Sequence, residues 1–196
     1  MTAGIATQAQ VQKGDWLLGG TFYYNTSSSN NGGATNTGSN SNLAPELGLA
    51  VSSNSVVGLS GGFSTGTTKD INTNKTTNTS FSAGVFWKRF FPINEKVGWF
   101  GDLSGQYVHS KFIYTLASGG KQESSANGFN ASLSPGVYYK PTRKIFLTAG
   151  IGGLSYGHSK STPGSANPVT YNSFDVSLLN YFNFGVSIVL NKERQM

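Results

Sequence analysis

The segment Trp16-Leu17-Leu18-Gly19-Gly20-Thr21-Phe22-Tyr23-Tyr24 alternates between two kinds of side chain. Its even positions carry Trp, Leu, Gly, Phe and Tyr, whereas its odd positions from 19 onward carry Gly, Thr and Tyr. A period of two is typical of a β-strand whose two faces meet different surroundings. We therefore predict a strand here with one apolar face and one more polar face.

The same alternation recurs in seven further segments, at about 43–51, 57–63, 81–88, 97–108, 129–140, 145–152 and 181–190. The connections between segments alternate between short turns and long polar stretches, at about 25–41, 65–79, 110–126 and 157–172. An even strand number with short turns at one end and long loops at the other is typical of outer-membrane barrels. We predict an all-β fold: an eight-stranded antiparallel up-and-down transmembrane β-barrel with four long extracellular loops and three short periplasmic turns.

The two faces of these strands differ in side-chain size. One face is rich in Leu, Val, Phe, Trp and Tyr, and the other in Gly, Ser, Thr and Asn. A soluble barrel would turn the large apolar side chains inward, but eight strands enclose a lumen just wide enough for side chains. We therefore expect the apolar face to contact lipid and the small residues to fill the lumen. Three inner-face aromatics, Phe86, Phe100 and Phe146, are expected to pack inside.

Aromatic residues of the outer face gather at two levels. Trp and Tyr favour membrane–water interfaces, so each level predicts one girdle of a transmembrane barrel. From Trp16 to Tyr24 a strand covers about 26 Å, or about 20 Å along a tilted barrel axis, close to the apolar band of such barrels. The predicted girdles comprise Trp16, Trp87, Trp99 and Tyr139 at the short-turn end, and Tyr24, Phe63, Tyr107 and Phe129 at the long-loop end.

Composition excludes several other classes. The 196 residues suit a single domain, and only 11% of them are charged. The chain has no cysteine, so neither a disulfide nor a cysteine-based metal or redox site is possible. The net charge of +6 could suit nucleic acid, but the basic residues follow turn positions instead of forming one stripe. We expect no nucleic-acid partner, and instead contact between the basic turn end and anionic lipid headgroups.

Polar and charged residues on the inner face form the candidate site. They are Glu46, Lys88, Asp102, Gln106 and Lys140. A charge inside a narrow lumen persists only if it is paired and hydrogen-bonded. We predict a polar network that closes the lumen in preference to an ion path, with Lys88 and Asp102 as diagonal neighbours across the turn at Pro92.

A catalytic site is weakly supported by the sequence. His109 precedes Ser110 near the predicted outer interface, which suits acyl transfer in a lipid-modifying enzyme. Neighbours on a strand point to opposite faces, however, and no acidic residue is placed to orient the histidine. We predict that the protein is not an enzyme, and we expect no metal and no cofactor.

Four segments, 16–24, 43–48, 86–92 and 134–139, resemble the outer-membrane β-barrel domain family common in Bacteroidota. The resemblance covers nearly the whole chain after about residue 13, and it implies a small OmpX/OmpA-like barrel in the bacterial outer membrane. It also implies contact with phospholipid and lipopolysaccharide, and a structural or surface-interaction role through the extracellular loops. A protein partner at the loops or barrel wall, in a larger complex, fits this role.

An alternative function is a small pore or a lateral conduit for apolar molecules, similar to what OmpW-like barrels are proposed to do. A gap in the wall and an apolar interior would favour this alternative. Pro45 and Pro135 interrupt predicted strands and hint at an irregular wall, because proline has no N–H to donate to a ladder. We expect residues 1–13 to be a disordered signal-peptide remnant or leader, residues 14–190 the barrel, and residues 191–196 a periplasmic tail.

Overall fold

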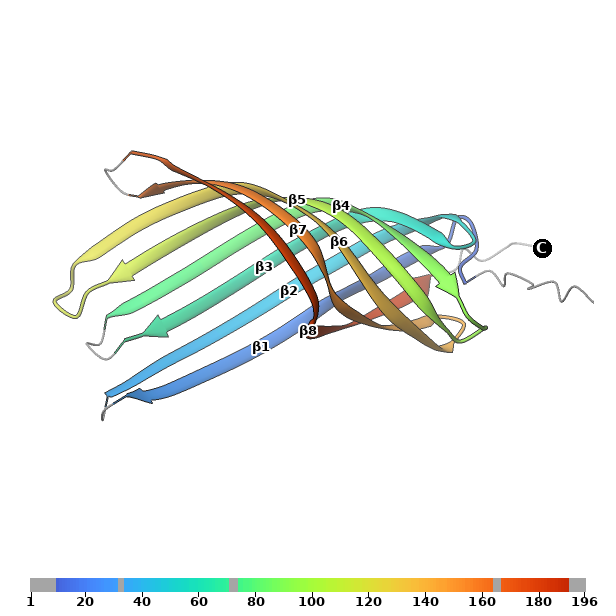
Figure 1. The fold of residues 1–196 in the computed structure, drawn as a ribbon, viewed down its shortest axis with the longest axis horizontal. Coiled ribbons are helices and arrows are strands. Elements are labelled where there is room, and N and C mark those ends of the chain that lie inside the picture. Colours follow the sequence, from blue (N-terminus) through green and yellow to red (C-terminus); the bar gives the residue numbers. More distant parts are fainter. Residues whose placement is uncertain (1–9, 32–33, 71–73, 164–166, 191–196) are drawn as a thin grey trace, which may run out of the picture.

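The computed structural model describes residues 10–31, 34–70, 74–163 and 167–190. They form the predicted eight strands, which are β1 (Trp16–Asn31), β2 (Ala34–Ser52), β3 (Ser55–Lys69), β4 (Lys75–Pro92), β5 (Val97–Thr115), β6 (Lys121–Thr142), β7 (Ile145–Pro163) and β8 (Val169–Leu190). Each strand pairs antiparallel with the next, and β8 pairs with β1 to close the barrel (Figure 1). No helix among these residues is long and apolar enough to cross a membrane.

The apolar face of the sheet points outward, as the sequence predicts. In β4 the side chains of Phe81, Val85 and Trp87 are 55%, 59% and 43% exposed, whereas the alternate residues Phe86 and Lys88 are buried. The inward aromatic positions are confirmed, since Phe100 and Phe146 are also buried. The lipid-facing surface is therefore made of the large side chains, and the lumen receives the smaller ones.

The four long connections are not loops, and here the prediction of 25–41, 65–79, 110–126 and 157–172 as loops is wrong. The exception is 112–116, whose alternation predicts an outward hairpin extension, and β5 runs through this segment as far as Thr115. The strands continue through them as paired hairpins beyond the outer girdle (Figure 1). In the first hairpin the ladder runs on from Asn25–Asn40 to Asn31–Ala34, about 20 Å of extra strand. A strand of Thr and Ser can carry polar side chains on both faces when its ladders satisfy the backbone N–H and C=O groups. The polar composition of these segments was therefore wrongly taken to indicate loops.

The periplasmic end of the lumen is filled by an aromatic floor made of Phe90, Tyr138 and Phe146. The ring centroids lie 5.1–5.7 Å apart, and all three side chains are nearly inaccessible to solvent. Glycines opposite the inward aromatics make room for them. A Cβ on Gly98 would lie 2.5 Å from the Tyr138 hydroxyl, and one on Gly136 would lie 2.4 Å from the ring of Phe100. These inner-face glycines thus leave space for the inward-pointing aromatic rings.

The segment just before β1 caps this floor, so the predicted disorder is wrong for residues 10–13. Gln10 and Val11 are buried, and both backbone amides donate to the carbonyl of Ser53. The Lys140 ammonium also donates to the carbonyl of Gln10. These contacts give the segment partners that a leader lacks. The predicted leader residues 1–9 and the predicted tail at 191–196 lie outside the described residues.

The seam between β1 and β8 is much shorter than the other ladders. In the part of the chain that the structure describes, it comprises five residue pairs, from Trp16–Leu190 to Gly20–Val186. Above it, β1 pairs with β2 alone and β8 with β7 alone. The tips of the β1–β2 and β7–β8 hairpins accordingly lie on opposite sides of the open end (Figure 1).

The wall is irregular on both sides of this seam, near the two prolines. The β2–β3 ladder is interrupted between Leu43 and Glu46, around Pro45, and the β6–β7 ladder between Leu133 and Gly136, around Pro135. Between β7 and β8 the register shifts at Gly150/Gly152. The wall irregularity that the prolines suggest is therefore present.

Amide hydrogen exchange in lipid nanodiscs tests the hairpin extensions. We expect the paired amides among residues 25–30 and 35–40 to exchange slowly, because their ladder bonds must open before exchange. The amide of the exposed turn residue Ser118 in the same protein provides the fast-exchanging internal reference. Exchange of the two hairpin segments at the rate of this turn would contradict the structure.

Candidate functional site: the lumenal ion cluster

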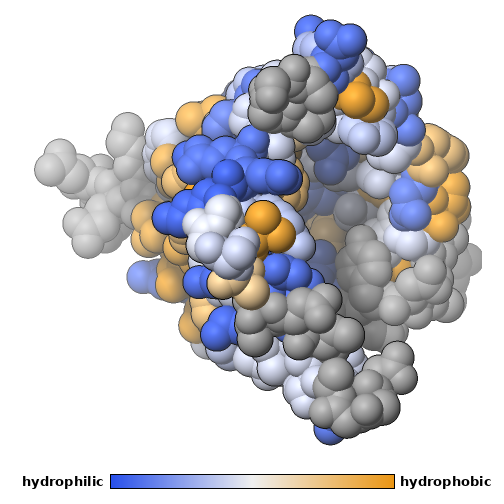
Figure 2. Space-filling model, turned by 90° about the vertical axis from the view of Figure 1, so that its left-hand side faces the viewer, coloured by the Kyte–Doolittle hydropathy of each residue, from blue (hydrophilic) through white to orange (hydrophobic). Residues whose placement is uncertain are grey.

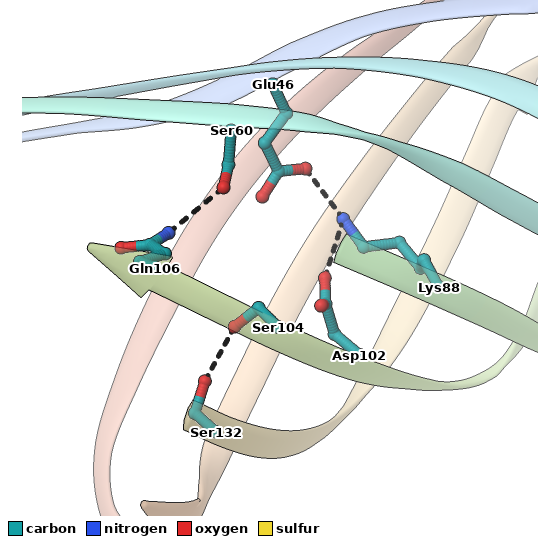
Figure 3. Close-up of polar contacts among 7 residues, drawn as sticks. All are labelled: Glu46, Ser60, Lys88, Asp102, Ser104, Gln106 and Ser132. Atoms are coloured by element: carbon teal, nitrogen blue, oxygen red, sulfur yellow. Dashed lines mark hydrogen bonds and ion pairs between the residues drawn. The ribbon is translucent and has the colours of Figure 1, made fainter. Parts of the chain in front are cut away.

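Three charged side chains from neighbouring strands meet in the lumen. The Lys88 ammonium donates to Glu46 Oε2 at 2.8 Å and lies 3.1 Å from Asp102 Oδ2 (Figure 3). We call these three residues the lumenal ion cluster. The Lys88 side chain is 11% exposed, so its charge depends on these carboxylates and not on water.

The positions of the cluster follow from strand register. Lys88 on β4 and Asp102 on β5 are direct partners, so the expected diagonal relation is wrong. The four-residue connection between these strands sets that register, and period-two patterning alone does not determine it. Glu46 reaches the cluster from β2 across the intervening strand β3.

Two inner-face aromatic rings lie close to the lysine of the cluster. The Lys88 Nζ lies 5.1 Å from the ring centroid of Phe86 and 5.8 Å from that of Phe100. A cation is attracted to the face of an aromatic ring at such distances. The sequence analysis placed these two rings inside the barrel but did not connect them with the lysine.

The other two predicted lumenal residues lie apart from the cluster. Gln106 donates from Nε2 to Ser60 Oγ at 3.1 Å, one layer further toward the open end (Figure 3). Lys140 lies at the periplasmic end, bonded to the Gln10 carbonyl and 4.9 Å from the centroid of the Phe146 ring. The five residues therefore form three separate layers.

Hydroxyl pairs continue the polar lining above the cluster. Ser104 and Ser132 share a hydrogen bond of 2.8 Å, and Ser80 and Ser110 share one of 2.7 Å (Figure 3 for the first pair). Figure 2 looks into this open end, which is hollowed and bordered by hydrophilic residues, with hydrophobic residues on the outside. The lumen is a polar cup with a charged layer and an aromatic floor beneath it.

All eight predicted girdle residues lie on the outer face. Their exposed fractions range from 41% to 64% in the structure, for Trp16, Trp87, Trp99, Tyr139, Tyr24, Phe63, Tyr107 and Phe129. Tyr156 and Phe174, which are register partners, are also exposed on the outside and were missed. The shift at Gly150/Gly152 reverses which positions of β7 face outward, and a period-two pattern gives no warning of it.

His109 and Ser110 point to opposite faces. His109 Nδ1 lies 2.7 Å from Asn127 Oδ1 on the outside, whereas Ser110 pairs with Ser80 inside. His158 is held in the same way, by Asn172 at 2.7 Å. Among the described residues there is no group of three His, Asp or Glu side chains that could hold a metal ion.

These features define a transmembrane β-barrel: strands with a lipid-facing apolar surface, aromatic girdles at two levels, and a lumen filled by its own side chains. The chain belongs to the outer membrane protein beta-barrel domain family, whose model matches residues 1–187. The protein is accordingly a component of the bacterial outer membrane. A comparison with curated proteins found no significant match.

Solved structures share the fold at low sequence identity. The chain is similar to the translocator domain of the autotransporter NalP from Neisseria meningitidis, with 18% identity and a TM-score of 0.52 over 95% of this chain and 72% of that one. It is also similar to a major outer membrane protein from Thermus thermophilus, with 13% identity and a TM-score of 0.50 over 90% and 98% of the two chains. At these identities the likeness concerns the fold alone.

Replacing the cluster lysine tests its role. We expect Lys88→Met to destabilise the barrel by about 3 kcal/mol, because two carboxylates then face each other without a cation. Unfolding by urea in detergent micelles, followed by the electrophoretic shift between folded and unfolded barrel, measures this loss. The double variant Lys88→Met/Glu46→Gln removes one carboxylate and should recover part of the loss. Equal stability of Lys88→Met and the parent protein would contradict the cluster.

Proposed function

We propose that the protein is a closed membrane barrel that presents four stiff hairpins at the cell surface, in a structural or surface-interaction role. The observation that carries this proposal is the obstructed lumen. The lumenal ion cluster, the aromatic floor and the buried residues Gln10 and Val11 lie in series between the open end and the periplasm. A barrel obstructed in this way offers no path along its axis, which favours a role at its surface.

The hairpins suit a binding surface. Their ladders continue for several residue pairs past the outer girdle, as far as Lys69–Lys75 in one hairpin and Thr115–Lys121 in another. Backbone pairing lowers the ordering cost that a disordered loop would pay on binding. We propose a protein partner at these hairpins or at the barrel wall, within a larger outer-membrane complex.

The wall itself is proposed to contact phospholipid and lipopolysaccharide. The exposed Leu, Val, Phe and Trp side chains match acyl chains, and the basic residues near the short turns, such as Arg89 and Arg143, match anionic headgroups. The order of the segments 16–24, 43–48, 86–92 and 134–139 along the chain further supports the proposal that the protein is an OmpX/OmpA-like barrel of Bacteroidota.

A second candidate is the lateral conduit for apolar molecules. The short β1–β8 seam favours it, because the described residues of β1 and β8 share no ladder beyond Gly20–Val186. The lining argues against a wholly apolar cargo, since Ser60, Ser104 and Gln106 face the lumen. This candidate therefore stands second.

Trimming the hairpins tests the surface role. Deleting 27–38, 66–78, 111–125 or 159–171, each replaced by an Asn-Gly turn, shortens one hairpin at a time without changing the barrel register. We expect each variant to keep its folded electrophoretic mobility and at least one trimmed variant to lose a partner that co-purifies with the parent from native outer membrane. An unchanged set of co-purifying proteins after trimming all four hairpins would contradict the proposal.

Planar-bilayer recording tests the obstructed lumen. We expect the parent protein and Glu46→Gln to show conductance near zero, since the aromatic floor stays intact and Lys88 keeps Asp102 as partner. An open outer-membrane porin reconstituted in the same bilayers serves as the positive control. Stable single channels in the parent protein would contradict a closed lumen.

A further inference from the structure

A pocket of about 400 Å³ lies in the wall where the β1–β8 ladder ends. Its lining includes Gly19, Thr21, Phe22, Leu43, Phe184 and Gly185. Phe22, Leu43 and Phe184 belong to the exposed outer face, with exposed fractions of 53–74%. The glycines and Thr21 alternate with these residues and lie on the lumenal side, so the pocket is lined from both faces of the wall.

This pocket lies at membrane depth. Gly20 is midway along the strand between Trp16 of the inner girdle and Tyr24 of the outer girdle. Backbone without a ladder is tolerated in the hydrocarbon region only where it is covered or lines a water-filled cavity. In the described part of the chain, the edges of β1 and β8 next to the pocket share no ladder beyond Gly20–Val186. Such edges are tolerated here only if the lumen beside them holds water or if another group covers them.

Small residues occupy the lumenal side of the wall where the two edges separate. Gly20 has φ +154°, a conformation that L side chains rarely adopt, and a Cβ there would lie 2.5 Å from the Ala44 carbonyl oxygen. Gly185 lies opposite on β8, and a Cβ on Gly185 would lie 3.4 Å from Thr21 Cγ2. The wall therefore stays thin at this level, with apolar rings outside and small residues inside.

The lumen beside the pocket is polar and carries a net negative charge. Hydroxyl and amide groups line it above the lumenal ion cluster, including Ser60, Ser104 and Gln106. The cluster itself holds one ammonium and two carboxylates, Glu46 and Asp102. An anionic group entering from the seam would meet a layer of net charge −1, whereas an uncharged hydroxyl-bearing group would meet matching hydrogen-bond partners.

We propose that the β1–β8 seam binds one amphiphile with an uncharged, hydroxyl-rich headgroup, such as a glycolipid. The headgroup occupies the polar cup, and the alkyl chain passes through the seam pocket and lies against Phe22 and Phe184 in the bilayer. A wholly apolar molecule would leave the Ser and Gln groups of the cup without new partners. This inference rests on the second candidate function and names its ligand class; it does not depend on the hairpin proposal.

Disulfide locking tests the seam, since the chain contains no native cysteine. Tyr23→Cys/Asn183→Cys places one cysteine on each edge, three residues beyond the last pair, Gly20–Val186. The control lock Thr65→Cys/Thr79→Cys joins register partners on β3 and β4, where the ladder is continuous and neither residue belongs to the polar cup. Electrophoresis without reductant shows whether each disulfide forms within one chain.

Native mass spectrometry then measures the bound amphiphile. The parent and both locked proteins are released from phosphatidylethanolamine vesicles that contain dodecyl maltoside or, separately, lauroyl lysophosphatidylglycerol. We expect the parent and the control lock to retain one maltoside, with at least about tenfold lower occupancy in the seam lock and for the anionic probe. Reducing the seam disulfide should restore retention.

A third variant separates charge discrimination from folding. Glu46→Gln leaves the Lys88–Asp102 pair and removes the net negative charge of the cluster, so we expect it to raise retention of the anionic probe relative to the parent protein.

Three outcomes overturn the proposal. Equal maltoside retention in the seam-locked and control-locked proteins shows that the seam is not the site. Equal retention of both probes by the parent removes the headgroup argument, and seam disulfides formed between two chains assign the edges to a second copy. If the parent retains maltoside but does not transport it across the vesicle membrane, the binding site is supported and the conduit function is eliminated. Failure of the binding site and failure of the conduit are therefore distinguishable.

Discussion

The absence of water from the hydrocarbon region constrains this structure more than any other condition. Every backbone N–H and C=O that faces lipid at that depth needs a partner within the protein, so strands can span only as a ring. Eight strands make a narrow ring, and its lumen must be filled by its own side chains. The outward Leu and Phe, the inward Ser and Gly, and the paired charges all follow from these two requirements.

Filling the lumen explains why glycine and large aromatics occur together on the inner face. Each inward ring occupies space that a glycine leaves open on the neighbouring strand. The pairs of ring and glycine are Phe86 with Gly58, Phe100 with Gly136, and Tyr138 with Gly98. A lumen filled only with serine and glycine would hold water throughout. The rings of Phe86 and Phe100 lie beside Lys88 and leave it little contact with solvent, so its charge depends on Glu46 and Asp102.

Period-two patterning predicted the strand number, the lipid-facing side and the inward position of Glu46, Lys88 and Asp102. It could not predict register, which depends on turn length and on bulges such as that at Gly150/Gly152. It also mistook most of the polar hairpins for loops, because both faces of those strands meet water and, outside 112–116, no alternation remains. The capping of the floor by Gln10 and Val11 leaves no periodic signal either.

The strand ladders are not equally continuous around the ring. From β3 to β6 the ladders run without a register shift, and the lumenal ion cluster joins β2, β4 and β5 on that side. The interruptions at Pro45, Pro135 and Gly150 all lie on strands at or near the seam. The proposed lateral access therefore lies on the side of the wall where ladders are interrupted, away from the β4–β5 pair that carries Lys88 and Asp102. Lateral access and an obstructed lumen are therefore compatible properties of one wall.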